Sequence, residues 1–357
     1  MEIETILRRA IDCGASDIFV VAGLPLTFKV RGEQVRDEAA GKYTPQMTER
    51  FAQAVYQLAG REPHCVTGRE TDDDFSFSLS GIGRFRVNMF RQRGSIAAVV
   101  RVISFGLPTA EEAHIPPEVM QVADMKKGIV LVTGAAGSGK STTLACIINQ
   151  INHSRSGHIL TLEDPVEYIH RHGQCIISQR EIHIDCPSYV AALRSALRES
   201  PDVILLGEMR DRETMEVAMT AAETGQLLLS SLHTTGAANT IDRIIDAFPP
   251  NQQSQIRLQL SMVLQAVISQ QLVPGVDGQP IPAFEIMYTT MAIRNMIRES
   301  KTHLLESAIA SGGAMGMRTM DMALTELVTQ GKITKETALT HCVNYETMKK
   351  RLGMSTM

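Results

Sequence analysis

One short segment restricts the possible folds of this chain more than any other. An apolar run at 128–133 is followed by the sequence GAAGSGKS at 134–141 and then by a segment with helical character. A strand, a glycine-rich loop and a helix in this order form the phosphate-binding loop of nucleoside triphosphatases. The alternative, a chance glycine turn, does not explain the flanking strand and helix. The segment therefore predicts an α/β domain that binds a nucleoside triphosphate.

The residues of this loop suit ATP with bound Mg²⁺. The glycines let backbone N–H groups approach phosphate oxygens, and the following helix adds the positive end of its dipole. Lys140 is expected to bridge the β- and γ-phosphates, and the Ser141 hydroxyl to bind Mg²⁺, while Thr142 contacts the region of the α-phosphate. The predicted nucleotide-binding residues are Gly134, Ala135, Ala136, Gly137, Ser138, Gly139, Lys140, Ser141 and Thr142.

Two acidic residues follow strand-like runs, where catalytic groups of such sheets gather. The run 203–206 leads into Glu208, which we expect to lie on the metal side, partly through water. The run 158–162 leads into Glu163, which we expect to act as general base or to orient the attacking water. A solvated loop acid is the plainer interpretation of each. Both residues are nevertheless predicted to be catalytic.

A histidine follows a third apolar run. The run 227–232 ends at His233, where an imidazole could sense the γ-phosphate and pass on its loss. Strand-end histidines are often only structural, so this role depends on the position of the residue rather than on its type.

The order of the predicted elements indicates two main domains. Residues 1–107 show helical spacing near the start, and Phe75, Phe77 and Leu79 alternate with serines as in a half-buried strand. A Pro/Glu-rich connector covers 108–117. Residues 118–290 alternate strands and helices, which is typical of a parallel sheet. The remainder, about 251–345, looks mainly helical with a hairpin-like interruption at 274–288, and 291–357 form the helical C-terminal region.

Composition and charge exclude several classes of protein. The formal charge of −4 is spread over mixed acids and bases, so we expect no direct binding of nucleic acid. Six scattered cysteines fit a reducing cytosol. Charges within the first 14 residues argue against an export signal, and no apolar run approaches the roughly 20 residues of a membrane span. Any membrane association is therefore expected to be peripheral.

Taken together, these segments resemble the PilT family, the type IV pilus retraction ATPases of the secretion ATPase superfamily. The resemblance spans nearly the whole chain. It is carried by GAAGSGKSTT at 134–143, ILTLEDPVEYIH at 159–170, DVILLGEMRD at 202–211, TGQLLLSSLHTTGA at 224–237 and AIRNMIRE at 292–299.

The resemblance implies a PAS-like α+β N-terminal domain, a RecA-like P-loop ATPase domain with a mainly helical C-terminal region, and a homohexameric ring. It further implies a motor that drives pilus retraction and twitching motility, bound to an inner-membrane platform protein at the inner face of the cytoplasmic membrane. Arginines of the small domain would approach the nucleotide. Arg84, Arg93 and Arg101 occupy the matching stretch, although the exposed face of a sheet explains charged residues equally well.

Some positions depart from the family pattern. Ala135 and Ala136 stand where Pro-Thr is usual, and Gln226 stands where the histidine box commonly has its first histidine. Three alternatives stay open: a related secretion or DNA-uptake motor, an extension ATPase, and a nucleotide-gated scaffold that does not hydrolyse ATP. The extension ATPases are longer at the N-terminus and carry a four-cysteine insertion, which this sequence lacks.

Overall fold

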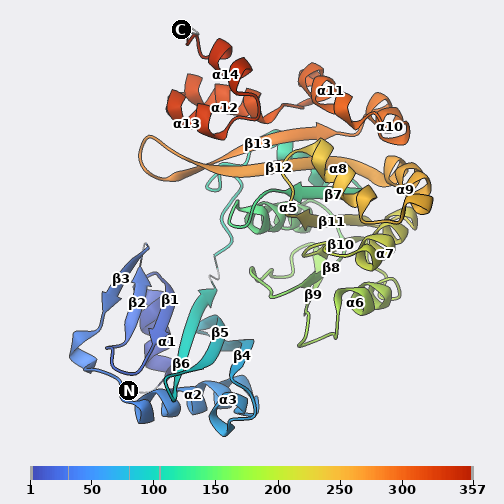
Figure 1. Ribbon diagram of the computed structural model, residues 1–357. Helices are drawn as coiled ribbons and strands as arrows, with labels where there is room; N and C mark the ends of the chain where they lie inside the picture. Colours follow the sequence, from blue (N-terminus) through green and yellow to red (C-terminus); the bar gives the residue numbers. More distant parts are fainter. Residues whose placement is uncertain (1–2, 31, 80, 104–105, 355–357) are drawn as a thin grey trace. The chain divides into compact units, whose positions relative to one another are not determined.

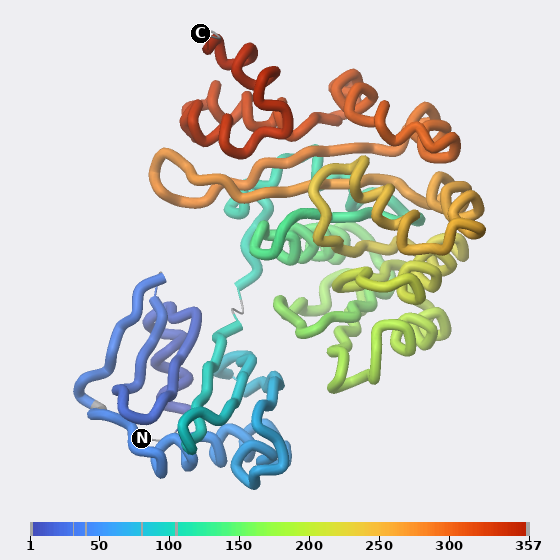
Figure 2. Tube along the Cα trace, in the orientation of Figure 1, coloured from blue at the N-terminus to red at the C-terminus, as the bar shows by residue number. Residues whose placement is uncertain are grey.

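The computed structural model describes residues 3–30, 32–79, 81–103 and 106–354, traced in Figures 1 and 2. The chain divides into two units, Met1–Gly106 and Leu107–Met357. Each unit has its own apolar core.

The N-terminal unit is an antiparallel sheet of six strands in the order β3-β2-β1-β6-β5-β4. Phe75 and Phe77 are buried in β4 as expected, but Ser76 between them is also buried, where its hydroxyl accepts a hydrogen bond from Arg84, so the alternation is incomplete. In β5, Phe85, Val87 and Met89 are buried at alternate positions, so one face of the sheet packs on helices. The elements are α1 (Ile3–Asp12), β1 (Ala15–Val20), β2 (Thr27–Val30), β3 (Glu33–Arg36), α2 (Pro45–Ala59), α3 (His64–Thr67), β4 (Asp72–Leu79), β5 (Gly83–Gln92) and β6 (Ser95–Ile103).

The second unit contains a seven-stranded sheet in the order β13-β12-β7-β11-β10-β8-β9. Every pair from β12 to β9 is parallel, and only β13 runs against its neighbour. All residues of β7, β10 and β11 are buried, as expected for strands covered on both faces. The strands are β7 (Gly128–Thr133), β8 (Gly157–Glu163), β9 (Cys175–Glu181), β10 (Val203–Leu206), β11 (Leu227–Leu232), β12 (Leu264–Pro274) and β13 (Pro280–Tyr288).

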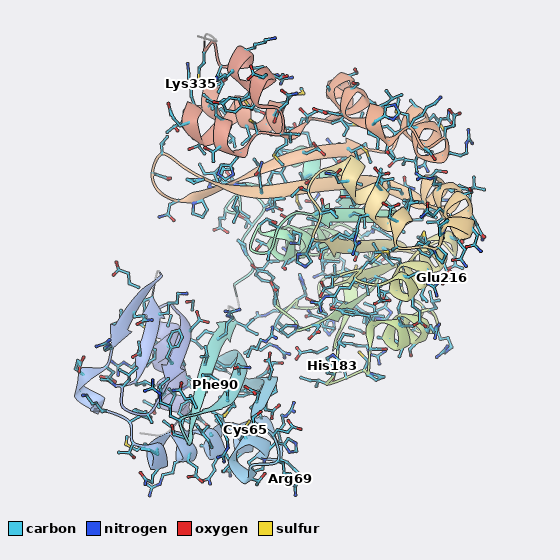
Figure 3. All side chains as sticks on the ribbon, in the orientation of Figure 1. Cys65, Arg69, Phe90, His183, Glu216 and Lys335 are labelled. Carbon is cyan, nitrogen blue, oxygen red and sulfur yellow. The ribbon has the colours of Figure 1, made fainter. Side chains whose placement is uncertain are left out.

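The helices of this unit cover the sheet and then extend beyond its β13 edge. Figure 1 shows the C-terminal helices lying along the β12–β13 hairpin. Figure 3 adds the side chains and labels Lys335, the first residue of α13. The helices are α4 (Pro117–Met120), α5 (Lys140–Ser154), α6 (Tyr189–Ala196), α7 (Arg212–Glu223), α8 (Ala237–Asp246), α9 (Pro250–Val263), α10 (Met291–Arg298), α11 (Leu305–Ser311), α12 (Met320–Thr329), α13 (Lys335–His341) and α14 (Tyr345–Arg351).

Strand β12 differs from the expectation. The segment before 274 was expected to be helical, but the chain leaves α9 directly into β12 at Leu264. Ala266, Val267 and Ile268 are all buried in β12, which lies between β7 and β13 in the sheet. Such a continuous apolar run is typical of a buried strand and of a buried helix alike, so the sequence pattern could not distinguish the two. The sheet is therefore extended beside the phosphate loop by a strand that the sequence pattern did not identify.

Among the described residues, no helix has the length and apolar character needed to cross a lipid bilayer.

Candidate functional site

The glycine loop follows β7 and adopts a conformation that requires glycine. Gly134, Gly137 and Gly139 have φ values of +147°, +76° and +87°, which residues with a Cβ rarely adopt. A Cβ on Gly134 would also lie 2.1 Å from the carbonyl oxygen of Gln270 in β12. The loop therefore fits closely against the neighbouring strand, which holds its backbone N–H groups in place.

The Lys140 side chain folds back into this loop. Its Nζ donates to the carbonyl oxygens of Gly134 and Ala135, both at 2.8 Å, and the residue is 8% exposed. Burial lowers the pKa of the ammonium, while the charges of Glu208 and Glu167 oppose that shift. The cation is thus fixed inside the loop, where phosphate oxygens would approach it.

The hydroxyl groups of the loop differ in their surroundings. Ser138 is buried, and among the described residues its Oγ has no hydrogen-bond partner. Ser141 is exposed in the first turn of α5, and Thr142 Oγ1 lies 2.8 Å from the Tyr168 hydroxyl. Ala135 and Ala136 are exposed at the tip of the loop. The predicted nucleotide-binding residues are therefore brought together, as their closeness in sequence requires.

Glu208 follows β10 and is almost buried, with 9% exposure. Arg210 Nη2 lies 2.6 Å from its Oε1, and His233 Nε2 lies 3.4 Å from its Oε2. Within the described chain, Oε2 has no hydrogen-bond partner. The carboxylate is thus paired with one cation on one side and leaves an oxygen available on the other. The structure brings Glu208 and His233 together because β10 and β11 are neighbours in the sheet, a contact that the sequence analysis did not predict.

Glu163 is the last residue of β8 and has a different environment. Its Oε1 accepts hydrogen bonds from Thr161 Oγ1 at 2.7 Å and from Gln179 Nε2 at 3.4 Å. Burial raises the pKa of the Glu163 carboxyl to about 7, against the lowering effect of these two bonds. A group with this pKa can take up a proton near neutral pH, as a general base must.

The strand order decides how these groups are arranged. Strand β11 lies between β7 and β10, and β8 lies on the other side of β10. The carboxyl ends of these parallel strands meet at one edge, so the loop, His233, Glu208 and Glu163 follow one another along it. The arrangement can hold a triphosphate at one end and a proton acceptor at the other.

Three residues of this edge were not identified from the sequence. Arg210 pairs with Glu208, and the buried Gln270 accepts a hydrogen bond from Thr143 Oγ1 at 2.7 Å behind the loop. Tyr189 lies among the acids: burial, then the charges of Glu208, Asp164 and Glu163, raise the pKa of its phenol. Arg210 could have been found from its spacing to Glu208. Gln270 and Tyr189 belong to other segments of the chain, and nothing in the sequence around them indicates that they lie at this edge.

The three predicted arginines lie in the N-terminal unit. Arg84 donates to Ser76 Oγ and Ser78 Oγ, and Arg101 Nε donates to Asp17 Oδ1 at 3.1 Å. Arg93 lies in the turn between β5 and β6, whereas Arg84 is at the other end of β5. At about 3.3 Å per residue, these two arginines are about 30 Å apart and cannot serve a single phosphate together.

Comparison with known proteins gives concordant matches. The family described as "Type II/IV secretion system protein" matches residues 2–280. The chain is 44% identical over 339 residues to the type IV pilus retraction ATPase PilT of Pseudomonas aeruginosa, covering 95% of this chain and 97% of that protein. It is 49% identical over 306 residues to a twitching motility protein of Neisseria gonorrhoeae, covering 85% and 82% of the two chains.

A solved structure agrees in fold. The crystal structure of the pilus retraction motor PilT with bound ADP matches with a TM-score of 0.90 and 42% identity, over 98% of this chain and 99% of that chain. The resemblance thus extends through both units and through the candidate site.

Proposed function

Because the chain belongs to the Type II/IV secretion system protein family, as a P-loop ATPase of the PilT type, we propose that it is the motor of pilus retraction and works as a homohexameric ring. The observation that carries the chemistry is the pairing of Glu208 and His233 at adjacent strand ends beside the phosphate loop. A carboxylate for the metal side and a group that can respond to the γ-phosphate are what a nucleotide-driven motor needs.

The donor set fits Mg-ATP. The Ser141 hydroxyl is exposed at the first turn of α5, and Glu208 Oε2 and Ser138 Oγ are buried oxygens without a hydrogen-bond partner in the described chain. Hydroxyl and carboxylate oxygens are the ligands that Mg²⁺ prefers. Bound Mg²⁺ would neutralise charge on the phosphates. Ser141 and Glu208 would hold it, in part through water, while Lys140 and the loop N–H groups hold the phosphates.

Glu163 is proposed to orient the attacking water and to accept its proton. Its raised pKa keeps the carboxyl near the point at which a proton can be gained and released at neutral pH. The hydrogen bonds from Thr161 and Gln179 fix its orientation. His233, which is half exposed, would then report on the γ-phosphate through its contact with Glu208.

The arginines are proposed to act between subunits. An arginine supplied by a neighbouring subunit stabilises the charge that develops during phosphoryl transfer. Arg84, Arg93 and Arg101 are the candidates, and their distribution over both ends of the β5–β6 hairpin means that any one subunit would supply only one end to a given nucleotide. Hydrolysis would change the arrangement of the units, and the work would reach an inner-membrane platform protein from the cytoplasmic side.

The decisive experiment is a steady-state ATPase assay with substitutions that preserve shape. Glu163→Gln and Glu208→Gln are each expected to lower kcat by about a hundredfold or more, because one removes the proton acceptor and the other a charge on the metal side. Glu216→Gln is the matched control: Glu216 lies on the exposed side of α7, as Figure 3 shows, and its loss should leave kcat unchanged. If both variants hydrolysed ATP at the wild-type rate, the proposed roles would be wrong.

A further inference from the structure

A buried carboxylate on β13 lies outside the catalytic edge and has no part in the mechanism described so far. Glu285 is in the middle of β13, directly opposite Ser269 on β12, and is only 7% exposed. Burying a carboxylate is costly unless its oxygens accept hydrogen bonds. The partners of Glu285 therefore indicate what the residue is for.

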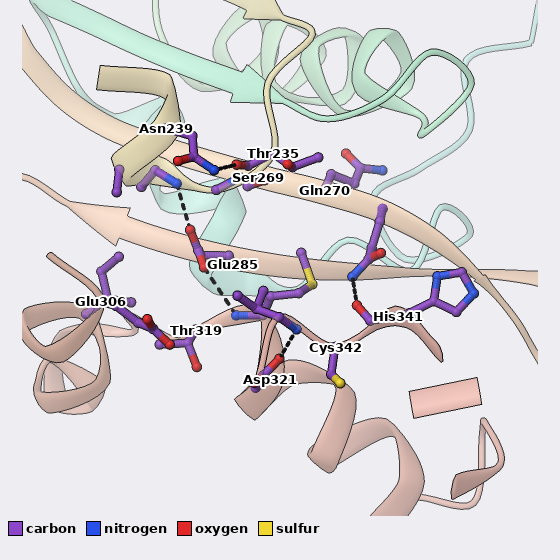
Figure 4. Close-up of a pocket in the computed structure, with 17 residues that line it drawn as sticks. Thr235, Asn239, Ser269, Gln270, Glu285, Glu306, Thr319, Asp321, His341 and Cys342 are labelled. Carbon is purple, nitrogen blue, oxygen red and sulfur yellow. Dashed lines mark hydrogen bonds between the residues drawn. The ribbon is translucent and has the colours of Figure 1, made fainter. Parts of the chain in front are cut away.

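Its two oxygens bind two different helices, as the dashed lines in Figure 4 show. Oε1 accepts from the backbone N–H of Ala237 at 2.8 Å, and Oε2 accepts from that of Met320 at 3.3 Å. Ala237 and Met320 are the first residues of α8 and α12. Helix starts carry unsatisfied N–H groups and partial positive charge, so one carboxylate caps both helices.

The α8 contact leads directly to the candidate site. The short loop 233–236, which joins β11 to α8, begins with His233, the residue that contacts Glu208. Its last residue, Gly236, has no side chain with which to cap α8, and its N–H donates to Ser269 Oγ at 2.8 Å. Two opposed residues of the β12–β13 hairpin, Ser269 and Glu285, therefore hold two successive N–H groups at the end of this loop.

The α12 contact leads to the C-terminal helices. Beside Met320, the carboxylate of Asp321 accepts from the N–H groups of Val343 and Asn344, at 2.7 and 3.0 Å, and so fastens the connection between α13 and α14. A cavity of about 490 Å³ lies between the start of α8, the hairpin and the C-terminal segments. Glu285 bridges this space, which leaves room for α12 to shift if one of its hydrogen bonds changes.

We propose that Glu285 is a positioning residue that couples the loop 233–236 to α12, so that the nucleotide state of the site is transmitted to the C-terminal helices. The inference rests on the proposed role of His233 in sensing the γ-phosphate. A movement of this loop displaces the Ala237 N–H, and the Glu285 carboxylate moves with it. The hydrogen bond from the Met320 N–H, which is the longer of the two, then breaks or forms. Such coupling requires that the two nucleotide states differ in this contact, and that difference can be measured.

The test is amide hydrogen exchange of the full-length protein with Mg-ADP and with a non-hydrolysable ATP analogue. In the wild type, exchange at 319–323 is expected to differ between the two nucleotides by about five- to tenfold, which is the size of a modest allosteric coupling. Glu285→Gln keeps the shape but replaces one acceptor oxygen with an NH₂ group, so the difference should vanish. Protection of the phosphate loop by either nucleotide should remain.

A second pair of variants removes the bond from the other side. Met320→Pro eliminates the N–H at the first position of α12, where proline is tolerated, and Met320→Ala makes a comparable truncation but keeps the N–H. Only the proline variant should lose the nucleotide-dependent difference at 319–323. This pair keeps the inference testable if Glu285→Gln does not fold.

The readout separates coupling from a purely structural role. If Glu285 only stabilised the fold, its substitution would speed exchange at 319–323 equally with both nucleotides and leave their ratio unchanged, which would overturn the inference. A wild type without any difference at 319–323, but with a protected phosphate loop, would also overturn it. Loss of protection at the loop itself, or a wild type that does not hydrolyse ATP, would instead count against the proposed function.

Discussion

At the scale of single residues, the site separates two glutamates that look alike in sequence. Glu208 lies beside His233 and beside the guanidinium of Arg210, which balances its negative charge. Glu163 has hydroxyl and amide donors instead, and its burial raises its pKa to about 7. Environments that differ in this way support the proposed roles, in which Glu208 stabilises charge and Glu163 transfers a proton.

The raised pKa predicts the pH dependence of hydrolysis. Only ionised Glu163 can accept a proton, so kcat should rise with pH and level off above about pH 7. Gln179→Ala removes a hydrogen bond that favours the ionised form, so the rise should move to higher pH. The measurement is kcat between about pH 6 and pH 9. An identical rise in Glu163→Gln would show that another group causes it.

A second residue-scale prediction concerns the close fit of the loop against β12. Gly134→Ala would place a Cβ 2.1 Å from the Gln270 carbonyl oxygen, at a positive φ. Since backbone atoms cannot move aside cheaply, we expect a loss of about 3 kcal/mol in the free energy of unfolding by urea, without nucleotide. Gly137→Ala is the control, because its φ is also positive, at +76°, but a Cβ there would meet open space. Equal losses for both variants would contradict the prediction.

At the scale of elements, the segment GEMRD serves two purposes. Glu208 is left at the strand end, whereas Asp211 is the N-cap of α7 and accepts from the Thr214 N–H at 2.9 Å and from its hydroxyl at 3.0 Å. An acid in this motif is thus structural, because it satisfies the first turn of the helix that follows. The proposed catalytic acid and the capping acid are three positions apart in the sequence.

This difference can be tested by separating stability from rate. Asp211→Ala should cost about 1 kcal/mol of unfolding free energy through loss of the cap, and leave kcat and KM near the wild-type values. Asp211→Ser should recover most of that stability, because serine also caps helices. A large fall in kcat, or a changed requirement for Mg²⁺, would assign Asp211 to the metal site instead.

At the scale of the whole molecule, two separate cores suggest that nucleotide binding and hydrolysis depend on different units. The apolar core of Met1–Gly106 and those of Leu107–Met357 share no residues. The phosphate loop, Glu163, Glu208 and His233 all belong to the second unit, while the candidate arginines belong to the first. Binding and turnover are therefore expected to depend on different parts of the chain.

A fragment of residues 107–357 provides the corresponding test. It should fold and bind ADP with nearly unchanged affinity, because its core and its loop are intact. Its kcat should fall by about a hundredfold or more, because it lacks the arginines of the first unit. Isothermal titration and an ATPase assay give the two values. Hydrolysis at the full-length rate would exclude a catalytic role for Arg84, Arg93 and Arg101 together.

Local sequence was sufficient for the loop and for the strand ends. The residues 134–141 are contiguous, and buried strands such as β10 and β11 are short apolar runs that end at Glu208 and His233. A parallel strand must deliver the residue after it to the same edge as its neighbours, so local order places both side chains at one edge of the sheet. Their contact follows from the strand order, in which β10 lies beside β11. The family and the order of the two units follow from the same segments.

Only the tertiary structure decided what stands behind and beside that edge. The apolar run of β12 did not distinguish a strand from a helix. The positions of two of its residues, Gln270 against the loop and Ser269 opposite Glu285, were therefore not predicted either. The capping of α8 and α12 by one carboxylate joins segments far apart in the chain. Periodicity reports which face of an element is buried, but not which distant element covers it. The sequence thus determined which polar residues lie at the candidate site, and the packing determined how that site is connected to the C-terminal helices.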